Sequence, residues 1–225
     1  MTFDYSPFFA EYEALVALSE KTFKQVAEQY AEQVNCRIGC DDCCYALFDL
    51  SLIEAIYINH KFNEAFNASR LASLKEAANR IDRQIHKIKR SAHRDLMAGK
   101  NEELILMEMA AVRVECPLLN DAHQCELYAH RPITCRLYGI PTAIGGIGYT
   151  CGKSGFKEGE AYPTVNLDPI QRKLHDISAD LVKAIRSSYA DLADMLVPLS
   201  MALITDYDQT FLGTKDVTGE EIDDE

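Results

Sequence analysis

Half of the cysteines in this sequence fall within nine consecutive positions, in the stretch C-R-I-G-C-D-D-C-C. This first band consists of Cys36, Cys40, Cys43 and Cys44. A second band follows much later in the chain and consists of Cys116, Cys125, Cys135 and Cys151. Deprotonated thiols are soft ligands that bind Zn²⁺ or assemble iron–sulfur clusters. We therefore expect all eight cysteines to be metal ligands, with an iron–sulfur cluster or Zn²⁺ as the cofactor.

The spacing leaves the division of the eight thiols open. Each band could form its own four-cysteine site, or both bands could contribute to each metal. Alternatively, four cysteines could hold one [4Fe–4S] cluster while the rest are structural or redox thiols. If residues 36–44 are helical, steps of four, three and one residues place the first band on one side of the helix. Four disulfides would use the same residues, but a cytosolic chain keeps its thiols reduced.

Residues 114–163 contain the second band and are rich in glycine, proline and tyrosine, without long periodic patterns. A loop-rich segment of this kind buries little apolar surface by itself. A bound metal would supply the missing stability, as it does in small metal-dependent domains. We therefore favour sites that join both bands, because such sites would anchor this segment to the rest of the chain.

Two arginines and a tyrosine near Cys135 are the candidate cofactor-binding residues beyond the thiols. Neighbouring thiolates repel one another, and the positive charges of Arg131 and Arg136 would offset that repulsion or donate hydrogen bonds to sulfur. The alternative for both arginines is a structural salt bridge or stacking on a tyrosine ring. Tyr138 would shield the site from water or bond a sulfur, and its alternative role is loop packing.

Oxygen and nitrogen ligands are expected to play a smaller part. Asp41 and Asp42 separate the cysteines of the first band, and we expect both to be solvated because softer ligands are so close. His123 and His130 flank Cys125 and could bind zinc. With eight thiols present, we expect a surface or capping role for both histidines.

The elements that must position these residues are mainly helices. Apolar residues at helical spacing predict helices over residues 7–34, 51–61, 69–97, 101–112, 168–189 and 191–204. Ser51 and Glu54 have the pattern of a capping box, and Asn101 is a candidate N-cap. Asp168 and Pro169 read as an N-cap followed by proline at the first helical position. The last predicted helix is bent or restarted at Pro198.

We therefore predict a mainly α protein: a single helical domain with a loop-rich, cysteine-dense metal-binding centre. Its parts are an N-terminal helix within residues 1–35, the cysteine-cluster region 36–165, C-terminal helices within 166–205, and an acidic disordered tail over 206–225.

Charge and hydropathy exclude several classes of protein. The formal charge of −12 argues against a nucleic-acid binder. No apolar run is long enough for a membrane span, and the N-terminus lacks the features of a secretory signal, so we expect a cytoplasmic protein. The helix predicted over residues 69–97 is strongly basic, and we expect its positive face to be solvated, to dock an acidic protein partner or to dock the chain's own acidic tail. That face consists of Arg80, Arg83, Lys87, Arg90 and Arg94.

The cysteine bands and the residues around them resemble the YkgJ-type cysteine-cluster family, a zinc- or iron-chelating domain known by the signature CxxCxxCC. The matching segments are C-R-I-G-C-D-D-C-C from Cys36, C-P-L-L from Cys116, C-E-L-Y from Cys125, R-P from Arg131, C-R-L-Y from Cys135, and Cys151. The resemblance covers roughly residues 36–152. One departure is the first gap, which has three residues here where the signature has two.

The resemblance implies metal chelation but no particular reaction, although the family includes enzymes such as flagellin lysine N-methylase. Three classes therefore remain open: an adaptor with a structural metal, an electron carrier, and a metal-dependent enzyme. The sequence contains no Ser-His-Asp arrangement, no phosphate loop and no dinucleotide fingerprint.

Overall fold

A computed structural model describes residues 3–157 and 159–214 of the chain. The part that it describes is a mainly α single domain with eight α-helices and a few short strands, as the sequence predicts. Four helices form the core of the domain, which we call the helical scaffold. They are α1 (Ser6–Gln29), α2 (Leu52–Ala65), α6 (Asp168–Ala184) and α7 (Leu199–Ile204).

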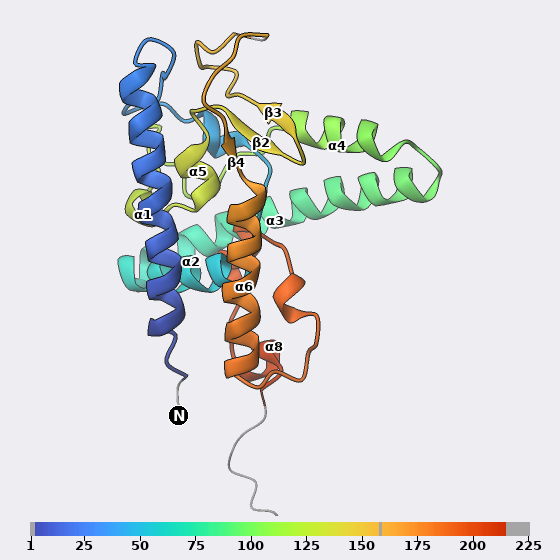
Figure 1. Cartoon of the computed structure of the whole chain (residues 1–225). Coiled ribbons are helices and arrows are strands. Elements are labelled where there is room, and N and C mark those ends of the chain that lie inside the picture. The colour runs from blue at the N-terminus through green and yellow to red at the C-terminus, as the bar shows by residue number, and fades with distance from the viewer. Residues whose placement is uncertain (1–2, 158, 215–225) are drawn as a thin grey trace, which may run out of the picture.

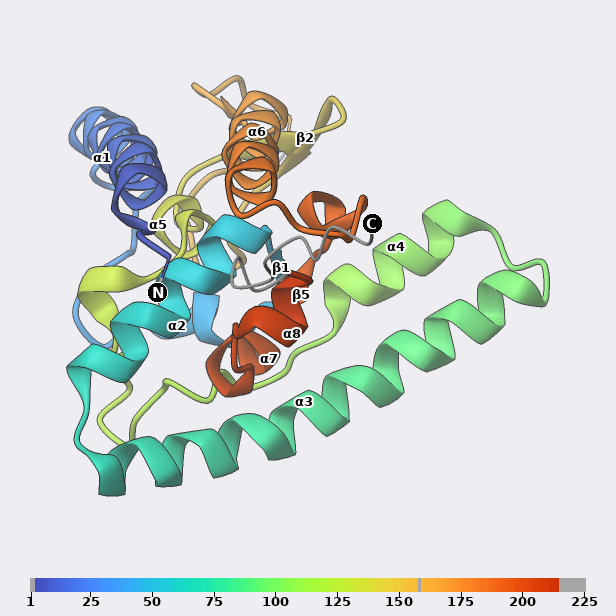
Figure 2. The same ribbon diagram turned by 90° about the horizontal axis from the view of Figure 1, so that it is seen from below.

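Helix α2 lies at the centre of the scaffold and packs against α1, α6 and α7 (Figures 1 and 2). Its sequence is apolar on most faces, and residues Leu52 to Ile58 are all buried. Ile177 and Leu181 of α6 and Leu203 of α7 complete this core with almost no exposed surface. Burial of so much apolar area is the main stabilising contribution to this part of the molecule.

Two further helices extend away from the scaffold as a hairpin (Figure 2). Helix α3 (Ala68–Met97) packs against α7 (Ser200 donates to Asp82 at the middle of α3), and α4 (Glu102–Ala111) returns alongside its end. The turn between them contains Gly99, whose φ of +87° is in the left-handed region that favours glycine. The basic residues expected on α3 from Arg80 to Arg94 lie on its exposed face.

Local helix signals in the sequence are confirmed where they involve side-chain caps. Ser51 and Glu54 form the predicted capping box at the start of α2, and the Asn101 side chain caps α4. Asp168 is instead the first residue of α6, and its carboxylate accepts a hydrogen bond from the Gly145 N–H at 3.0 Å. The N-cap prediction for Asp168 is therefore wrong, although the proline does lie at the helix start.

The predicted helix over residues 191–204 is wrong in its first half. Leu192–Asp194 is a single 3₁₀ turn, and Val197–Pro198 forms strand β5, which pairs with β1 (Asp49–Leu50). Helix α7 then begins at Leu199, so the expected restart at Pro198 is confirmed. The pairing with β1 competes with helix formation here, and it ties α7 to the chain segment just before α2.

The cysteine-rich segments contain only short elements. The condition considered for residues 36–44, a helix with the first band on one side, is not met: Gly39 has a φ of +85°, and only Asp42–Tyr45 forms a 3₁₀ turn (η1). The second band spans η2 (Tyr128–His130), α5 (Ile133–Leu137) and two antiparallel strands, β2 (Thr142–Ile144) and β3 (Ile147–Tyr149). Strand β4 (Val165–Asn166) adds in parallel to β2, which places β2 at the middle of this sheet.

The prediction of an acidic disordered tail from residue 206 is wrong for residues 206–214. Residues 206–214 include helix α8 (Gln209–Leu212), and Leu212 is buried in the core. Residues 215–225 lie outside the described residues. Among the helices that are described, none combines the length and the apolar character that crossing a lipid bilayer requires.

Candidate metal centre

All eight cysteines line one cavity of about 460 Å³, and all eight thiols are free. The cavity lies where the first band meets the segments that carry the second band. Apolar side chains of the scaffold and of α3, including Phe23, Ile58 and Ile85, form much of the rest of its surface. Exposed Ile38 and Tyr128 also line it, so the cavity reaches the protein surface.

One group of cysteines is brought together by the ends of two loops. The Gly155 N–H donates to the Gln33 carbonyl at 2.7 Å, and the Asn35 side-chain amide donates to the Lys153 carbonyl at 2.7 Å. These bonds place the chain before Cys36 beside the chain after Cys151. Gly139 is required here, because a Cβ at that position would overlap the Sγ atom of Cys36.

A second group is connected by main-chain contacts on the other side of the first band. The Cys116 N–H donates to the Cys44 carbonyl at 2.7 Å, next to a bridge between Ala46 and Arg113. A further bridge pairs Leu119 with Cys125, so the chain turns back and carries Cys125 towards Cys116. Helix α5 contributes Cys135, and a hydrogen bond with Cys43, burial and the charges of Cys43, Cys116 and Cys125 raise the pKa of its thiol.

Several backbone N–H groups donate to these sulfur atoms. Leu118 and Leu119 donate to Cys116, and Leu127 donates to Cys125. The Lys153 N–H lies 3.4 Å from the Cys151 sulfur. Each of these bonds favours the negative thiolate and lowers the pKa of its cysteine. Main-chain donors two or three residues after a cysteine are therefore oriented to stabilise the form of sulfur that binds metals.

Burial and mutual repulsion oppose ionisation of the same thiols. Burial, followed by the charges of neighbouring cysteines, raises the pKa of Cys36 to about 11, and burial raises the pKa of Cys116 to about 12. Hydrogen bonds from Cys135 and Cys44 lower the pKa of Cys43 far below its ordinary value. A bound cation would relieve the repulsion among the thiolates, and that relief would favour metal binding.

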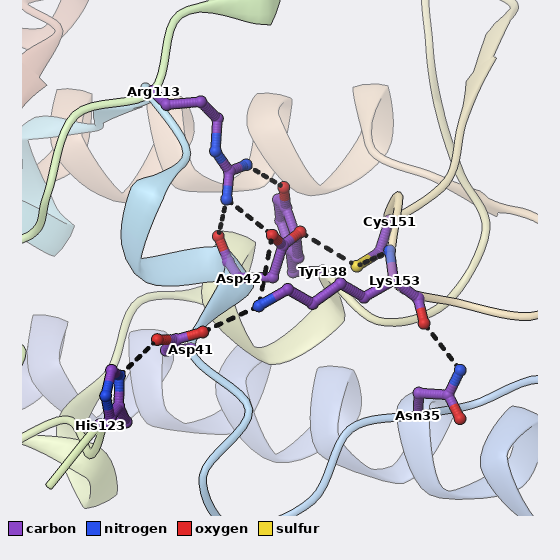
Figure 3. Close-up of polar contacts among 8 residues, drawn as sticks. All are labelled: Asn35, Asp41, Asp42, Arg113, His123, Tyr138, Cys151 and Lys153. Carbon is purple, nitrogen blue, oxygen red and sulfur yellow. Dashed lines mark hydrogen bonds and ion pairs between the residues drawn. The ribbon is translucent and has the colours of Figure 1, made fainter.

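Asp42 lies at the centre of a polar network beside the thiols (Figure 3). Its Oδ1 accepts a hydrogen bond from Arg113 Nη2 at 2.6 Å, and its Oδ2 accepts one from the Cys151 thiol at 3.2 Å. The same guanidinium donates to the Asp42 carbonyl and, through Nη1, to the Tyr138 hydroxyl at 3.3 Å. Tyr138 therefore lines the cavity through its ring while its hydroxyl pairs with Arg113.

Asp41 has a polar partner at each carboxylate oxygen. Lys153 Nζ lies 2.9 Å from Oδ1, and His123 Nδ1 lies 2.8 Å from Oδ2 (Figure 3). Asp41 and Asp42 are each only 8% exposed, so the prediction that both are solvated is wrong. Hydrogen bonds from Lys153 and His123 lower the pKa of Asp41, as expected for a carboxylate between two donors.

The two arginines predicted near Cys135 have different surroundings. Arg136 is buried and donates to the carbonyls of Arg131 and Ala129 and to the Glu20 carboxylate, so the hydrogen-bond partners of its guanidinium are oxygen atoms. These contacts match the alternative stated for Arg136, a structural salt bridge. Arg131 stacks on Tyr128 at 4.0 Å, and its buried Nε has no hydrogen-bond partner among the described residues. Its charge lowers the pKa values of Cys36, Cys43 and Cys125.

Sequence reasoning missed Arg113 and Lys153. Arg113 lies three residues before Cys116, and Lys153 lies two residues after Cys151, which is the same kind of proximity that singled out Arg131 and Arg136. An arginine or lysine within three residues of a second-band cysteine is therefore the sequence feature that could have identified Arg113 and Lys153. His130 is a different case, because its Nδ1 lies 3.4 Å from the Tyr57 hydroxyl, on the side of the scaffold.

The donor set fits a thiophilic metal in its chemistry. Eight free thiols face one cavity, backbone N–H groups donate to several sulfurs, and the unpartnered Arg131 Nε lies among the cavity-lining residues. Across residues 3–157 and 159–214, no three His, Cys, Asp or Glu side chains are placed closely enough to share one metal ion. The thiols thus surround the cavity and would have to move inward to coordinate a metal.

Comparison with known proteins agrees with this chemistry. No curated protein and no solved structure matches the chain. A family profile does match residues 35–152, just over half of the 225 residues, and this span includes all eight cysteines. The chain therefore belongs to the CxxCxxCC family, whose description reads "Putative zinc- or iron-chelating domain".

Proposed function

We propose that this protein is a cytosolic metal-binding protein whose eight cysteines chelate an iron–sulfur cluster or Zn²⁺. The observation that carries the proposal is that all eight free thiols, from two distant parts of the sequence, line one cavity. When bound, the metal would draw the thiolates together and neutralise their charge. Arg131 would add a positive charge next to the sulfurs, and Arg113 and Lys153 would hold the adjacent carboxylates.

Metal analysis of anaerobically purified protein tests the proposal. We expect stoichiometric zinc, or iron with acid-labile sulfide and a brown visible spectrum. A variant with all four second-band cysteines changed to serine should lose the metal. Ser51→Ala, which alters a residue bonded to Glu54 and not to a thiol, is the control for metal loss during purification. Wild-type protein that contains no zinc or iron and remains fully folded would defeat the proposal.

We also propose that the exposed positive face of α3 binds an acidic partner protein. Its residues are Arg80, Arg83, Lys87, Arg90 and Arg94. Arg80 pairs with Glu76 on the same helix, while the end of the hairpin projects away from the scaffold (Figure 2). A concentrated positive face on a protein of charge −12 would attract acidic surfaces over other parts of the molecule.

A charge-reversal experiment tests this second proposal. We expect the double variant Arg83→Glu/Lys87→Glu to bind a fluorescent poly-glutamate peptide about tenfold more weakly at low salt. Lys21→Glu/Lys24→Glu, an exposed double change on α1 with the same change in net charge, is the matched control and should have a much smaller effect. Equal weakening by both variants would show that only net charge matters and would contradict a docking face.

A further inference from the structure

The hairpin of α3 and α4 exposes a group of large apolar side chains. Five residues between positions 96 and 107 are between 44% and 75% exposed. They are Leu96, Met97, Leu104, Leu106 and Met107. Exposed large apolar residues that gather on one part of a domain mark a surface that another molecule covers.

Helix α4 has apolar residues on every side, but only one of its sides is covered. Ile105 is buried, and Met109, four residues later on the same side, is partly buried. Leu104 and Met107 lie on a second side and Leu106 on a third, and all three are exposed. A helix that is apolar all round is normally buried on all sides. Within the described part of the chain, no element covers the outer sides of α4.

The two helices of the hairpin carry opposite charges on their exposed surfaces. Glu108 of α4 pairs with Lys100 at 2.6 Å, whereas Glu102 and Glu103 have no ion-pair partner among the described residues. Basic side chains run along the exposed face of α3 from Arg80 to Arg94. The hairpin thus presents an acidic, apolar helix beside a basic one, which are the two halves of a complementary pair.

We propose that the partner of this hairpin is a second copy of the same chain, with α4 of each copy packed against α3 of the other. This inference rests on the positive docking face proposed for α3 and names its acidic partner. A two-fold dimer uses one surface twice, so that surface must be complementary to itself. Apolar residues of α4 form the centre of the interface, and its glutamates meet the basic residues on α3 of the other copy.

The shape of the molecule leaves the hairpin accessible to a second copy. Its end projects away from the helical scaffold, and its two helices lie side by side (Figure 2). Two such hairpins can pack as four helices, in which each α4 gains the neighbours that it lacks in one copy. The Lys100–Glu108 ion pair ties α4 to the turn after α3, so the surface exists before the two copies meet.

A lipid surface is the other occupant that an apolar helix beside a basic one could bind. The charges of α4 disfavour it, because Glu102, Glu103 and Glu108 lie among the exposed apolar residues and would face negatively charged headgroups. The same glutamates favour a protein surface with basic residues, which α3 of a second copy supplies.

The first test measures self-association of full-length, anaerobically purified protein by sedimentation velocity over a range of concentrations. We expect the wild type to dimerise, and Leu106→Gln/Met107→Gln to weaken dimerisation at least about tenfold. Glutamine removes the apolar surface but keeps the helix propensity and the net charge. The matched control is Leu18→Gln/Leu196→Gln, at leucines elsewhere on the surface that are 58% and 65% exposed, and it should dimerise like the wild type.

The second test places opposite charges on two variants. Glu102→Lys/Glu103→Lys makes α4 basic, and Arg90→Glu/Arg94→Glu makes the end of α3 acidic. Each variant alone should dimerise more weakly than the wild type, since α4 of one copy then repels α3 of the other. An equimolar mixture should restore dimers, because both contacts between the two copies then join opposite charges. Circular dichroism of each variant identifies any failure to fold.

The outcomes separate this inference from the acidic partner proposed for α3. Wild-type protein that is monomeric at every concentration overturns the dimer. The poly-glutamate measurement with Arg83→Glu/Lys87→Glu then decides independently whether α3 binds an acidic protein of another kind. Failure of both measurements would reject the positive docking face itself.

Two further outcomes would reject the surface assigned to the dimer. Equal weakening by Leu106→Gln/Met107→Gln and by its control would place the dimer contact elsewhere, and an equimolar mixture without recovery would reject the pairing of α4 with α3. Wild-type monomer that binds vesicles of phosphatidylcholine and phosphatidylserine, with binding lost in Leu106→Gln/Met107→Gln, would assign the apolar surface to lipid instead.

Discussion

The helical scaffold and the cysteine-rich segments are stabilised by different physical means. In the scaffold, α2, α6 and α7 bury apolar side chains such as Ile58, Leu181 and Leu203 almost completely. The cysteine-rich segments, residues 33–46 and 113–155, have only short helices and strands, and many of their contacts are hydrogen bonds and ion pairs around thiols. Apolar burial stabilises the first region without a ligand, whereas the second gathers thiols that repel one another when ionised.

The two regions are joined at α5, which carries Cys135. The Glu54 carboxylate at the start of α2 accepts a hydrogen bond from the Ile133 N–H at 3.2 Å. Arg136 reaches Glu20 on α1 from the other side of α5. The scaffold thus positions Cys135 firmly, while the loops with Cys36 and Cys151 depend on each other. We therefore expect a bound metal to stabilise the cysteine-rich loops more than the helical scaffold.

Removal of the proposed metal should separate the two regions most clearly. Metal at about 100 times its dissociation constant stabilises the folded form by about 2.7 kcal/mol, and this gain should be concentrated in the cysteine-rich segments. Chelation should therefore speed amide hydrogen exchange in residues 113–155 by about 100-fold while α2 and α6 exchange as before. Exchange rates that change equally in both regions would mean that they unfold as one unit.

A cavity in the scaffold should destabilise the whole molecule. Leu181 has no exposed surface, and Leu181→Ala is expected to lower the free energy of unfolding by about 2–5 kcal/mol. Urea denaturation followed by circular dichroism measures this loss. Leu196→Ala, at a residue that is 65% exposed, is the control and should change stability by less than about 0.5 kcal/mol. A small loss for Leu181→Ala would show that this core tolerates truncation by collapsing.

The connection at α5 provides a finer comparison. Arg136→Met removes the donors that the buried Arg136 guanidinium supplies to the carbonyls of Arg131 and Ala129, and their loss should cost about 1–3 kcal/mol. Glu20→Gln breaks only the ion pair, and Glu20 is 52% exposed, so its loss should stay below about 1 kcal/mol. Similar losses for the two variants in urea denaturation would show that the ion pair, and not the carbonyl bonds, holds α5.

The smallest expected effect is a pH dependence from Glu54. Burial raises the pKa of this carboxyl above its ordinary value of 4.5, so the folded protein holds the proton more tightly than the unfolded chain. The resulting stability is complete below the unfolded pKa and is lost as pH rises through the folded pKa. Relative to Glu54→Gln, the wild type should therefore become less stable from acidic to neutral pH.

Parallel urea titrations of the two proteins across that range provide the measurement. Glu32→Gln, an exposed change beyond the end of α1, is the control and should run parallel to the wild type. A difference between wild type and Glu54→Gln that does not vary with pH would contradict the inferred shift. It would mean that the hydrogen bonds from Ser51 and Ile133 to Glu54 offset the effect of burial.

Much of the fold could be predicted because its signals are local. The capping box at Ser51, the cap at Asn101 and the apolar spacing of α3 involve residues within one or two helical turns. The spacing of the first band left helix and loop open for residues 36–44, and the left-handed conformation of Gly39 shows that this segment is not helical. The predicted helix at 191–204 failed because β5 pairs with a strand that is distant in sequence.

The candidate ligands could be predicted from the sequence, because residue type and number give eight soft donors whatever the fold. Which thiols are neighbours, and that Asp42, Arg113 and Lys153 lie beside the thiols, depends on tertiary contacts. Those contacts join residues 71 positions apart, as for Arg113 and Asp42, or 109 apart, as for Cys151 and Asp42. Local rules of chain conformation do not extend over such separations, because the partners meet only when the helical scaffold brings the two bands together.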